Sequence, residues 1–269
     1  MRRWIVLLLS IFLMSCSSAQ KKEITLATTT SLQDSGLLEY LIPEFEKDTG
    51  IKVKVIARGT GEALEIAKRG DADILFVHSK EKEEEFIKEG YGLKRDEIMY
   101  NDFVIVGPKD DPAKVKENAS NNPLKAFELI YKSNSVFVSR GDESGTHQRE
   151  KKLWREININ PKWKSYIVSG LGMGQVLNIA DEKGGYTLSD RATYITMKKN
   201  LSLQIVCEGH PMLKNQYSIV LLNPNKISHK KELAEEFEVW ILSDKAKELI
   251  NNYGIEKYGE PLFKFNGKR

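Results

Sequence analysis

Residues 24–77 read ITLATTTSLQDSGLLEYLIPEFEKDTGIKVKVIARGTGEALEIAKRGDADILFV, a segment with two alternating kinds of apolar pattern. In some parts of it apolar and polar residues alternate, which predicts strands, and in others apolar residues recur with helical spacing. We expect strands at 24–28, 52–57 and 73–77, helices at 37–47 and 62–69, and turns at 49–50 and 59–61. Strands that alternate with helices indicate a parallel sheet that is covered by helices.

A second alternating series follows the apolar segment 103–108, which predicts a strand that ends at a Gly-Pro pair. Beyond a polar loop we expect helices at 123–131, 148–156 and 174–183, and strands at 136–138 and 203–206. The strand predicted at 217–224 has the same apolar character as 103–108 and also ends in proline. These two strands therefore predict a pair of hinges, after which helices at 230–242 and 244–253 return to the first domain.

The expected fold class is α/β, with two doubly wound α/β domains joined by two hinge strands. Domain I comprises residues 24–107 plus 220–269, and domain II comprises residues 108–219. Ligands of such folds bind outside the carboxyl ends of the strands, so we expect a ligand cleft between the two domains.

The amino terminus predicts export from the cytoplasm. Arg2 and Arg3 precede an apolar run over 4–14, which is typical of a signal peptide and too short for a bilayer span. The run ends at a Leu-Met-Ser-Cys sequence that resembles a bacterial lipobox. This resemblance implies a lipoprotein signal peptide over 1–15, an acylated Cys16 and a flexible tether over 16–23. An ordinary secretory signal with a chance cysteine is the alternative.

The charge balance argues against nucleic acid as a partner. Loss of the two signal-peptide arginines lowers the formal net charge from +3 to +1, whereas nucleic-acid binders usually carry a basic excess or stripe. The second cysteine, Cys207, has no partner left for an intramolecular disulfide once Cys16 is acylated, and we expect it to be buried. The four histidines lack metal-ligand spacing, so no metal site is predicted.

The segment 139–146, Ser-Arg-Gly-Asp-Glu-Ser-Gly-Thr, is the strongest candidate for a binding loop. It connects a predicted strand to a predicted helix, and the first amides of a helix have no partner within the helix. An oxyanion can accept hydrogen bonds from these amides, favoured by the helix dipole. Ser144 and Thr146 add hydroxyl donors, and Arg140 adds a charged guanidinium that can donate two parallel hydrogen bonds. A side chain at Gly145 would keep the backbone away from the ligand.

Two further polar segments follow the first two predicted strands. Thr29, Thr30 and Ser31 lie in a run of hydroxyl residues after the first strand, and Thr60 lies in a Gly-Thr-Gly turn after the second. Hydroxyls at these places can bind an anion, or they can merely cap helices.

These motifs resemble two related groups of proteins. The segment Arg-x-Asp-x-Ser-Gly-Thr resembles the anion-binding loop of periplasmic phosphate-binding proteins. Together with the hydroxyl run, the Gly-Thr-Gly turn and the Tyr-Thr-Leu-Ser-Asp-Arg-Ala-Thr segment at 186–193, it resembles the tungstate-binding component of bacterial ABC importers. The resemblance runs from residue 24 to the C-terminal helices.

The resemblance implies a type II periplasmic binding protein-like fold and a lipid-anchored solute-binding protein in the bacterial cell envelope. The ligand would be tungstate, then molybdate, with phosphate as the alternative, and the partners would be an ABC permease and ATPase. A monomer without cofactor is expected. The implied ligand-binding residues are Thr29, Thr30, Ser31, Thr60, Arg140, Ser144, Gly145 and Thr146. Arg191 either faces the cleft or is a structural arginine that ties Asp190 or a helix end.

The side chain of Asp142 bears on the choice of anion. A carboxylate that points into the site accepts a hydrogen bond from a protonated oxyanion such as phosphate. Tungstate and molybdate carry no proton near neutral pH, and for them Asp142 should turn aside and pair with Arg140. The sequence leaves both orientations open.

A hydrolase of oxyanion esters is the enzymatic alternative. Ser144 and His147 lie close in sequence, yet their spacing at a helix start does not aim the imidazole at the hydroxyl, and no nucleophile-elbow motif surrounds the serine. We therefore expect no catalysis. A sensory or scaffold lipoprotein with the same fold is a third possibility.

Overall fold

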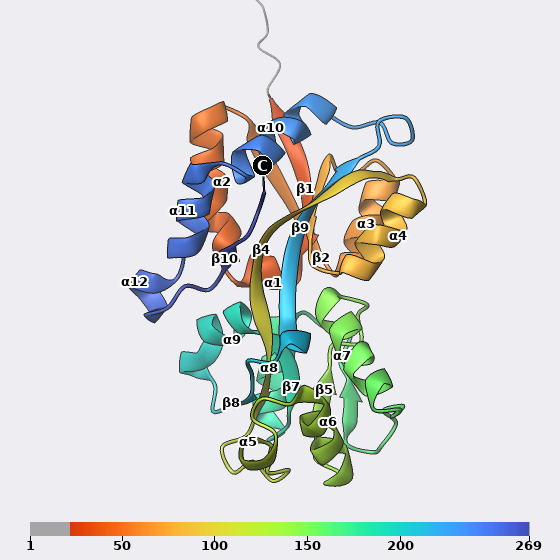
Figure 1. Cartoon of the computed structure of the whole chain (residues 1–269), viewed down its shortest axis with the longest axis vertical. Coiled ribbons are helices and arrows are strands. Elements are labelled where there is room, and N and C mark those ends of the chain that lie inside the picture. Colours follow the sequence, from red (N-terminus) through yellow and green to blue (C-terminus); the bar gives the residue numbers. More distant parts are fainter. Residues whose placement is uncertain (1–21, 269) are drawn as a thin grey trace, which may run out of the picture.

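The computed structural model describes residues 22–268. The predicted signal peptide, Cys16 and most of the predicted tether lie outside the described residues. Within the described range, no helix combines the length and apolar character needed to cross a membrane. Two domains lie one above the other in Figure 1 and are connected by two long strands.

Domain I is built on a mixed sheet with strand order β10-β4-β9-β3-β1-β2. β1 is parallel to both of its neighbours, whereas β9 is antiparallel to β3 and β4. The strands are β1 (Glu23–Thr29), β2 (Lys52–Arg58), β3 (Ile74–Val77), β4 (Gly92–Gly107), β9 (Lys214–Leu222) and β10 (Lys264–Phe265).

Helices cover both faces of this sheet, as expected for a doubly wound domain. Figure 1 shows α2, α10 and α11 on one face and α3 and α4 on the other. The helices of this domain are α1 (Thr30–Asp34), α2 (Leu37–Thr49), α3 (Thr60–Lys68), α4 (Lys80–Lys88), α10 (Lys231–Ile241), α11 (Asp244–Asn252) and α12 (Ile255–Tyr258). The two faces hold separate buried clusters, one around Phe45 and Phe237 and one around Leu64 and Phe86.

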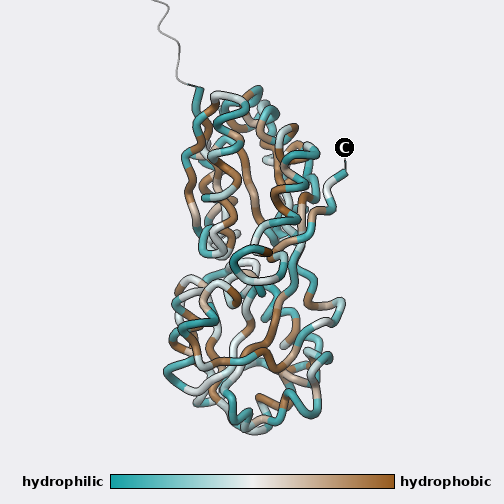
Figure 2. Tube along the Cα trace, turned by 90° about the vertical axis from the view of Figure 1, so that its left-hand side faces the viewer, coloured by the Kyte–Doolittle hydropathy of each residue, from teal (hydrophilic) through white to brown (hydrophobic). Residues whose placement is uncertain are grey.

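Domain II packs around a cluster of aromatic rings that includes Phe127, Phe137 and Trp154. Its helices are α5 (Val115–Asn118), α6 (Pro123–Lys132), α7 (Gly145–Glu156), α8 (Met173–Glu182), α9 (Arg191–Met197), η1 (Lys198–Asn200) and η2 (Pro211–Leu213). Its strands are β5 (Phe137–Ser139), β6 (Tyr166–Val168), β7 (Thr187–Asp190) and β8 (Gln204–Cys207). Figure 2 shows apolar residues gathered inside each of the two domains.

β4 and β9 connect the domains. β4 pairs with β9 as far as Asp102, and from Phe103 onward it pairs with β7 and β8 of domain II. One strand thus belongs to both sheets. The predicted domain boundaries, with domain I at 24–107 plus 220–269 and domain II at 108–219, remain a prediction. The strand pairing shows only where β4 changes partners, between Asp102 and Phe103.

The predicted α/β fold class is confirmed, and Cys207 is buried, as expected. β4 is longer than the predicted segment 103–108, because its first half carries charged residues that hide the strand pattern. β6 and β7 were not predicted, although the equally short β3, β5 and β8 were. β7 reads Thr-Leu-Ser-Asp, and its single apolar residue shows no strand pattern.

Candidate functional site

The segment that follows β5 leads directly into helix α7, as the sequence predicted. Ser144 is the N-cap of α7, and its Oγ accepts a hydrogen bond from the backbone N–H of His147 at 3.2 Å. Capping uses a lone pair of the hydroxyl and leaves its hydrogen free to donate. The amides of Gly145 and Thr146 belong to the first turn of the helix, where no intrahelical acceptor exists. The start of α7 can therefore donate several hydrogen bonds to an anion.

Arg140 is almost fully buried, with 2% of its surface exposed. Its Nη2 donates to Thr30 Oγ1 at 2.9 Å and to the carboxylate of Asp142. Its Nε and Nη1 are buried and have no hydrogen-bond partner within residues 22–268. Asp142 supplies a counter-charge, but the two free N–H-bearing atoms of this buried guanidinium still require acceptors that the described chain does not provide.

The hydroxyl residues of domain I meet Arg140 from the opposite side. Thr29 caps α1 by accepting from the Leu32 amide at 3.3 Å, and its Oγ1 lies 3.2 Å from Ser31 Oγ. Thr60 is fully buried at the start of α3, and its Oγ1 is without a partner among the described residues, as is Oγ1 of Thr146. Both domains thus direct free polar groups into one buried place.

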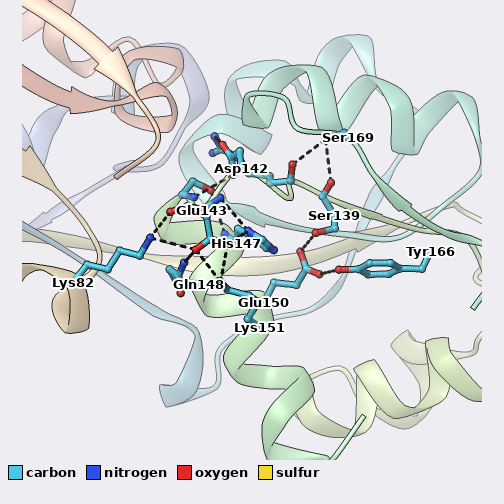
Figure 3. A network of polar contacts seen from close by, with 12 residues as sticks. Lys82, Ser139, Asp142, Glu143, His147, Gln148, Glu150, Lys151, Tyr166 and Ser169 are labelled. Carbon is cyan, nitrogen blue, oxygen red and sulfur yellow. Dashed lines mark hydrogen bonds and ion pairs between the residues drawn. The ribbon is translucent and has the colours of Figure 1, made fainter. Parts of the chain in front are cut away.

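The two domains touch around these groups. The backbone of Gly59, at the start of α3, lies so close to the loop before α7 that an added Cβ would be 3.1 Å from Asp142 O. Lys82 Nζ of domain I donates to Glu143 O at 3.1 Å, and Lys152 of domain II pairs with Glu81 at 3.3 Å. Figure 3 shows Lys82 reaching Glu143 across the boundary. The predicted residues therefore come together at an interface between domains.

Gly145 acts differently from the expectation. A Cβ at this position would lie 2.7–2.9 Å from three atoms of the His78 imidazole, which belongs to domain I. The absence of a side chain thus permits the opposite domain to approach the start of α7. We expected glycine at this position because a side chain would keep the backbone away from the ligand. The contact with His78 is a second reason why a side chain does not fit here.

His78, Asn215 and Tyr217 support the site from behind and were missed by the sequence analysis. His78 Nδ1 lies 2.7 Å from Asn215 Oδ1, and its Nε2 lies 3.2 Å from Ser31 Oγ. Burial lowers the pKa of His78 to about 4, so the ring is neutral near neutral pH. Its Nδ1 then donates to the amide oxygen, because that oxygen can only accept.

His78 could have been found from the sequence, because it directly follows the third predicted strand, as the other candidate groups follow the first two. Asn215 and Tyr217 lie on β9, and nothing in the sequence indicated that this strand passes behind the hydroxyl run.

Asp142 is turned toward Arg140 and its own loop. Its Oδ2 accepts from Arg140 Nη2, and its Oδ1 accepts from the Ser144 amide at 3.2 Å. This is the orientation that the sequence analysis associated with an unprotonated oxyanion. Each carboxylate oxygen thus accepts a bond from the protein itself, and Asp142 holds Arg140 and the loop in this orientation.

The loop itself is held in an unusual backbone conformation. Gly141 and Glu143 have φ values of +64° and +58°, in the left-handed region that few side chains adopt. A Cβ at Gly141 would lie 2.2 Å from Val168 Cγ1, so only glycine fits. Partial burial opposes ionisation of Glu143, yet its ion pair with Lys151 lowers its pKa to about 2. Figure 3 shows Glu143 among Lys82, Lys151 and Gln148.

Arg191 is not brought to this cluster. Its Nε and Nη2 donate to the Asp102 carboxylate at 2.6 and 2.7 Å, and Nη2 also bonds to Glu208. Two carboxylates neutralise its charge. Of the two roles left open by the sequence, the structure favours a structural arginine, but its partners are Asp102 and Glu208 and not Asp190 or a helix end.

The geometry around Ser144 is not that of a nucleophile with a base. The Ser144 hydroxyl oxygen bonds to the backbone of His147, whereas His147 Nδ1 accepts from the Glu143 amide at 3.1 Å. The imidazole is thus used within the loop, as the sequence spacing predicted.

A groove of ≈ 310 Å³ lies between the domains and is bounded on its inner side by His78 and Gly145. Its walls carry basic side chains from domain II, including Arg149 and Lys152. Such a groove between domains is where the doubly wound fold predicts ligand access.

The amino-acid sequence matches the PBP superfamily domain over residues 16–245. The chain belongs to this superfamily. It is 49% identical to the tungstate-binding protein TupA of Peptoclostridium acidaminophilum, over 98% of this chain and 96% of that protein. The tungstate-binding protein TupA of Desulfovibrio alaskensis G20 has a TM-score of 0.76 at 43% identity, covering 92% of this chain and 100% of that chain.

The structure of the tungstate ABC transporter from Geobacter sulfurreducens is similar, with a TM-score of 0.79 at 42% identity, and covers 86% of this chain and 98% of that one. The type II periplasmic binding protein fold of the superfamily is confirmed for this chain. These relatives are named for binding and transport, in agreement with the prediction of a non-catalytic protein.

Proposed function

We propose that this protein captures a tetrahedral oxyanion, tungstate before molybdate, between its two domains for an ABC importer. The observation that carries the proposal is a set of buried polar atoms without partners in the described chain. They come from both domains and are Thr60 Oγ1, Thr146 Oγ1, and Nε and Nη1 of Arg140. Hydroxyls and a guanidinium donate hydrogen bonds. One group that bonds to all of them is therefore a small, negatively charged hydrogen-bond acceptor.

Two observations support tungstate over phosphate. Asp142 is turned toward Arg140 and the Ser144 amide, which is the orientation expected for an oxyanion without a proton. Three relatives that align with most of this chain are named for tungstate. The proposed contacts are Thr29, Thr30, Ser31, Thr60, Arg140, Ser144, Gly145 and Thr146.

Calorimetry tests this function directly. Tungstate, molybdate, phosphate and sulfate are titrated in turn into the purified protein at one ionic strength. We expect tungstate to bind most tightly and molybdate next. Tight binding of phosphate without binding of tungstate would contradict the choice of anion, and absence of binding for all four would contradict an oxyanion site.

The proposed place of action is outside the cytoplasmic membrane. The signal-like run over 4–14 and the lipobox-like sequence before Cys16 support export and a lipid anchor. Permease and ATPase subunits are the proposed partners, since a relative is named as part of a tungstate ABC transporter. A monomer suffices for this role, because both halves of the site come from one chain.

Labelling of the producing cells with radioactive palmitate tests the anchor. The chain should carry the label, and Cys16→Ala should remove it. A labelled Cys16→Ala variant would contradict acylation at this residue.

A further inference from the structure

Asp190 is a buried carboxylate at the end of β7 that the binding site described so far does not use. It is fully buried and caps α9. Its Oδ1 accepts from the backbone N–H of Thr193 at 2.9 Å and from Thr193 Oγ1 at 3.0 Å. Its Oδ2 is also buried, yet no residue of the described chain bonds to it. Helix capping therefore explains one oxygen of this carboxylate and leaves the other without a role.

The sheet of domain II places Asp190 beside Arg140. The start of β5 is bridged in parallel to Tyr186, just before β7, and the Val138 amide donates to Tyr186 O at 2.8 Å. Thr187 Oγ1 donates to Val138 O at 2.7 Å. The two segments run side by side in the same direction. Arg140, just after β5, and Asp190, the last residue of β7, therefore lie at the same edge of the sheet. This edge faces the hydroxyl residues of domain I.

Domain I also reaches this carboxylate. The hydroxyl of Thr193 shares its one hydrogen between Asp190 Oδ1 at 3.0 Å and Ser31 O of domain I at 3.4 Å. The positive charge of Arg140 acts on Asp190, as does the negative charge of Asp34 on α1. Asp190 thus lies among the groups proposed to bind the oxyanion.

An ionised carboxylate at this place conflicts with a dianion in the same buried space. Like charges repel strongly where water is excluded, and one of them then keeps or takes up a proton. Tungstate has no proton near neutral pH, and so the proton has to come from the solvent. A protonated carboxyl group has an O–H donor, which converts a repulsive contact into a hydrogen bond.

We propose that Asp190 takes up one proton from the solvent when tungstate binds and donates a hydrogen bond to it from Oδ2. This inference rests on the proposed function of the site. An O–H bond forms at Oδ2, the buffer loses the proton, and no other bond is made or broken. Monohydrogen phosphate would bring its own proton to the same oxygen, so Asp190 distinguishes the two anions by the source of the proton.

The titratable groups around Asp190 leave it as the best acceptor of that proton. Burial raises the pKa of Asp190 to about 6, against the opposing effects of Thr193 and Arg140. Burial lowers the pKa of His78 to about 4, and burial keeps the pKa of Tyr217 well above 10, so the phenol remains protonated.

The neighbouring carboxylates are less suited. Asp142 bonds to Arg140, and on β4 Asp102 is paired with Arg191. Desolvation also raises the pKa of Asp34, but this residue is exposed to solvent, whereas Asp190 Oδ2 is buried without a partner among the described residues.

The proposal fixes the direction of the pH dependence. Above a pH of about 6 the free protein has lost the proton that the complex needs. Tungstate affinity should then fall as the pH rises, by up to about tenfold per pH unit. The fall ends only at the higher pKa that Asp190 has in the complex.

Calorimetry at pH 8 in two buffers of different ionisation enthalpy counts the protons exchanged. We expect the purified wild-type protein to take up roughly one proton per tungstate. Asp190→Asn keeps the N-cap oxygen and supplies a permanent N–H donor in place of the carboxyl proton. This variant should take up no proton, and its tungstate affinity should stay constant between about pH 6.5 and 8.5.

Glu150→Gln is the matched control, because Glu150 is another buried carboxyl group of domain II, with a pKa that burial raises to about 7. Proton uptake should persist in this control. Tungstate binding without proton uptake by the wild type would overturn the proposal, as would uptake that survives Asp190→Asn or disappears in Glu150→Gln. If no oxyanion binds the wild type at any pH, the proposed function itself fails, which is a different result from binding without a proton.

Discussion

Arg140 divides its hydrogen bonds between the protein and the proposed ligand. Nη2 is held by Thr30 of domain I and by Asp142, while Nε and Nη1 have no partner within the described residues. The two protein contacts fix the plane of the guanidinium before a ligand arrives. A guanidinium that is already held in place loses little conformational entropy when it binds an oxyanion.

Arg140→Ala should weaken tungstate binding by about 3 kcal/mol or more, since each hydrogen bond to a charged group contributes roughly 1.5–3 kcal/mol. Titration calorimetry measures the change. Arg191→Ala is the matched control. Arg191 is bonded to Asp102 and Glu208, so its replacement should leave the tungstate affinity unchanged. An unaltered affinity in Arg140→Ala would remove this residue from the proposed site.

Gly145→Ala should also weaken tungstate binding, by a different route. The new methyl group would collide with the His78 ring and hold the two domains apart. We expect a loss of roughly 1–3 kcal/mol, the usual cost of overpacking. The double variant Gly145→Ala with His78→Ala restores the space, so its affinity should exceed that expected from adding the two single effects. Strict additivity would show that the contact does not limit closure.

The sequence indicated the polar residues at strand ends, but not those that support them. Ser144 and Thr146 stand out because a strand-to-helix loop rich in hydroxyls and glycine is typical of anion sites. Arg191 remained ambiguous because its partner Asp102 lies on β4, 89 residues earlier in the chain. No local pattern reports a pairing at that distance.

At the scale of elements, β5, α7 and β6 are joined by the carboxylate of Glu150. It accepts from Ser139 Oγ of β5 at 2.7 Å, from Trp154 Nε1 of α7 at 3.1 Å and from Tyr166 OH of β6 at 2.7 Å. Figure 3 shows Glu150 between Ser139 and Tyr166. The three bonds position the strand that precedes the binding loop and the helix that follows it.

Glu150→Gln should change how stability depends on pH. Burial raises the pKa of Glu150 to about 7, so the folded protein keeps a proton that the unfolded chain releases at the ordinary value of 4.5. This carboxyl group therefore contributes stability that is fully present below pH 4.5 and is lost as the pH rises toward about 7. Thermal unfolding at several pH values should show this loss in the wild type and a smaller one in the variant. Equal slopes would contradict the raised pKa.

Some elements could be predicted from the sequence because their apolar residues repeat over several turns, as in α2 and α10. The hinge strand β4 could be predicted only in part. Its residues 94–97 are Lys, Arg, Asp and Glu, and ion pairs such as Arg95 with Glu83 make such a segment stable in a sheet. Whether such a charged segment forms a strand depends on its tertiary partners, which the local sequence pattern does not show.

At the scale of the whole molecule, the two domains meet along their contact surface through polar groups as well as through packing. Ser31 of domain I accepts from Thr193 of domain II, and Lys82 contacts Glu143 from the other side. Surface ion pairs of this kind contribute little by themselves. A ligand that bonds to both domains therefore adds free energy to closure beyond these contacts.

Tungstate should both compact and stabilise the protein. At about a thousandfold excess over the dissociation constant, a ligand adds about 4 kcal/mol to the free energy of unfolding. For a chain of this size that corresponds to a rise in Tm of roughly 8–16 °C. Small-angle scattering should show a smaller radius of gyration with tungstate than without it. Both effects should largely disappear in Arg140→Ala, and a full response in that variant would contradict the proposed site.

The position of β9 in the sheet determines when the protein can fold during its synthesis. β9 lies between β3 and β4 of domain I, yet the chain reaches it only after all of domain II has been made. The sheet of domain I consequently lacks an inner strand until residue 222 has left the ribosome. An emerging chain therefore cannot complete the sheet of its first domain until most of its residues have been made. That delay suits a polypeptide that has to be threaded through a narrow translocation channel before it folds on the other side.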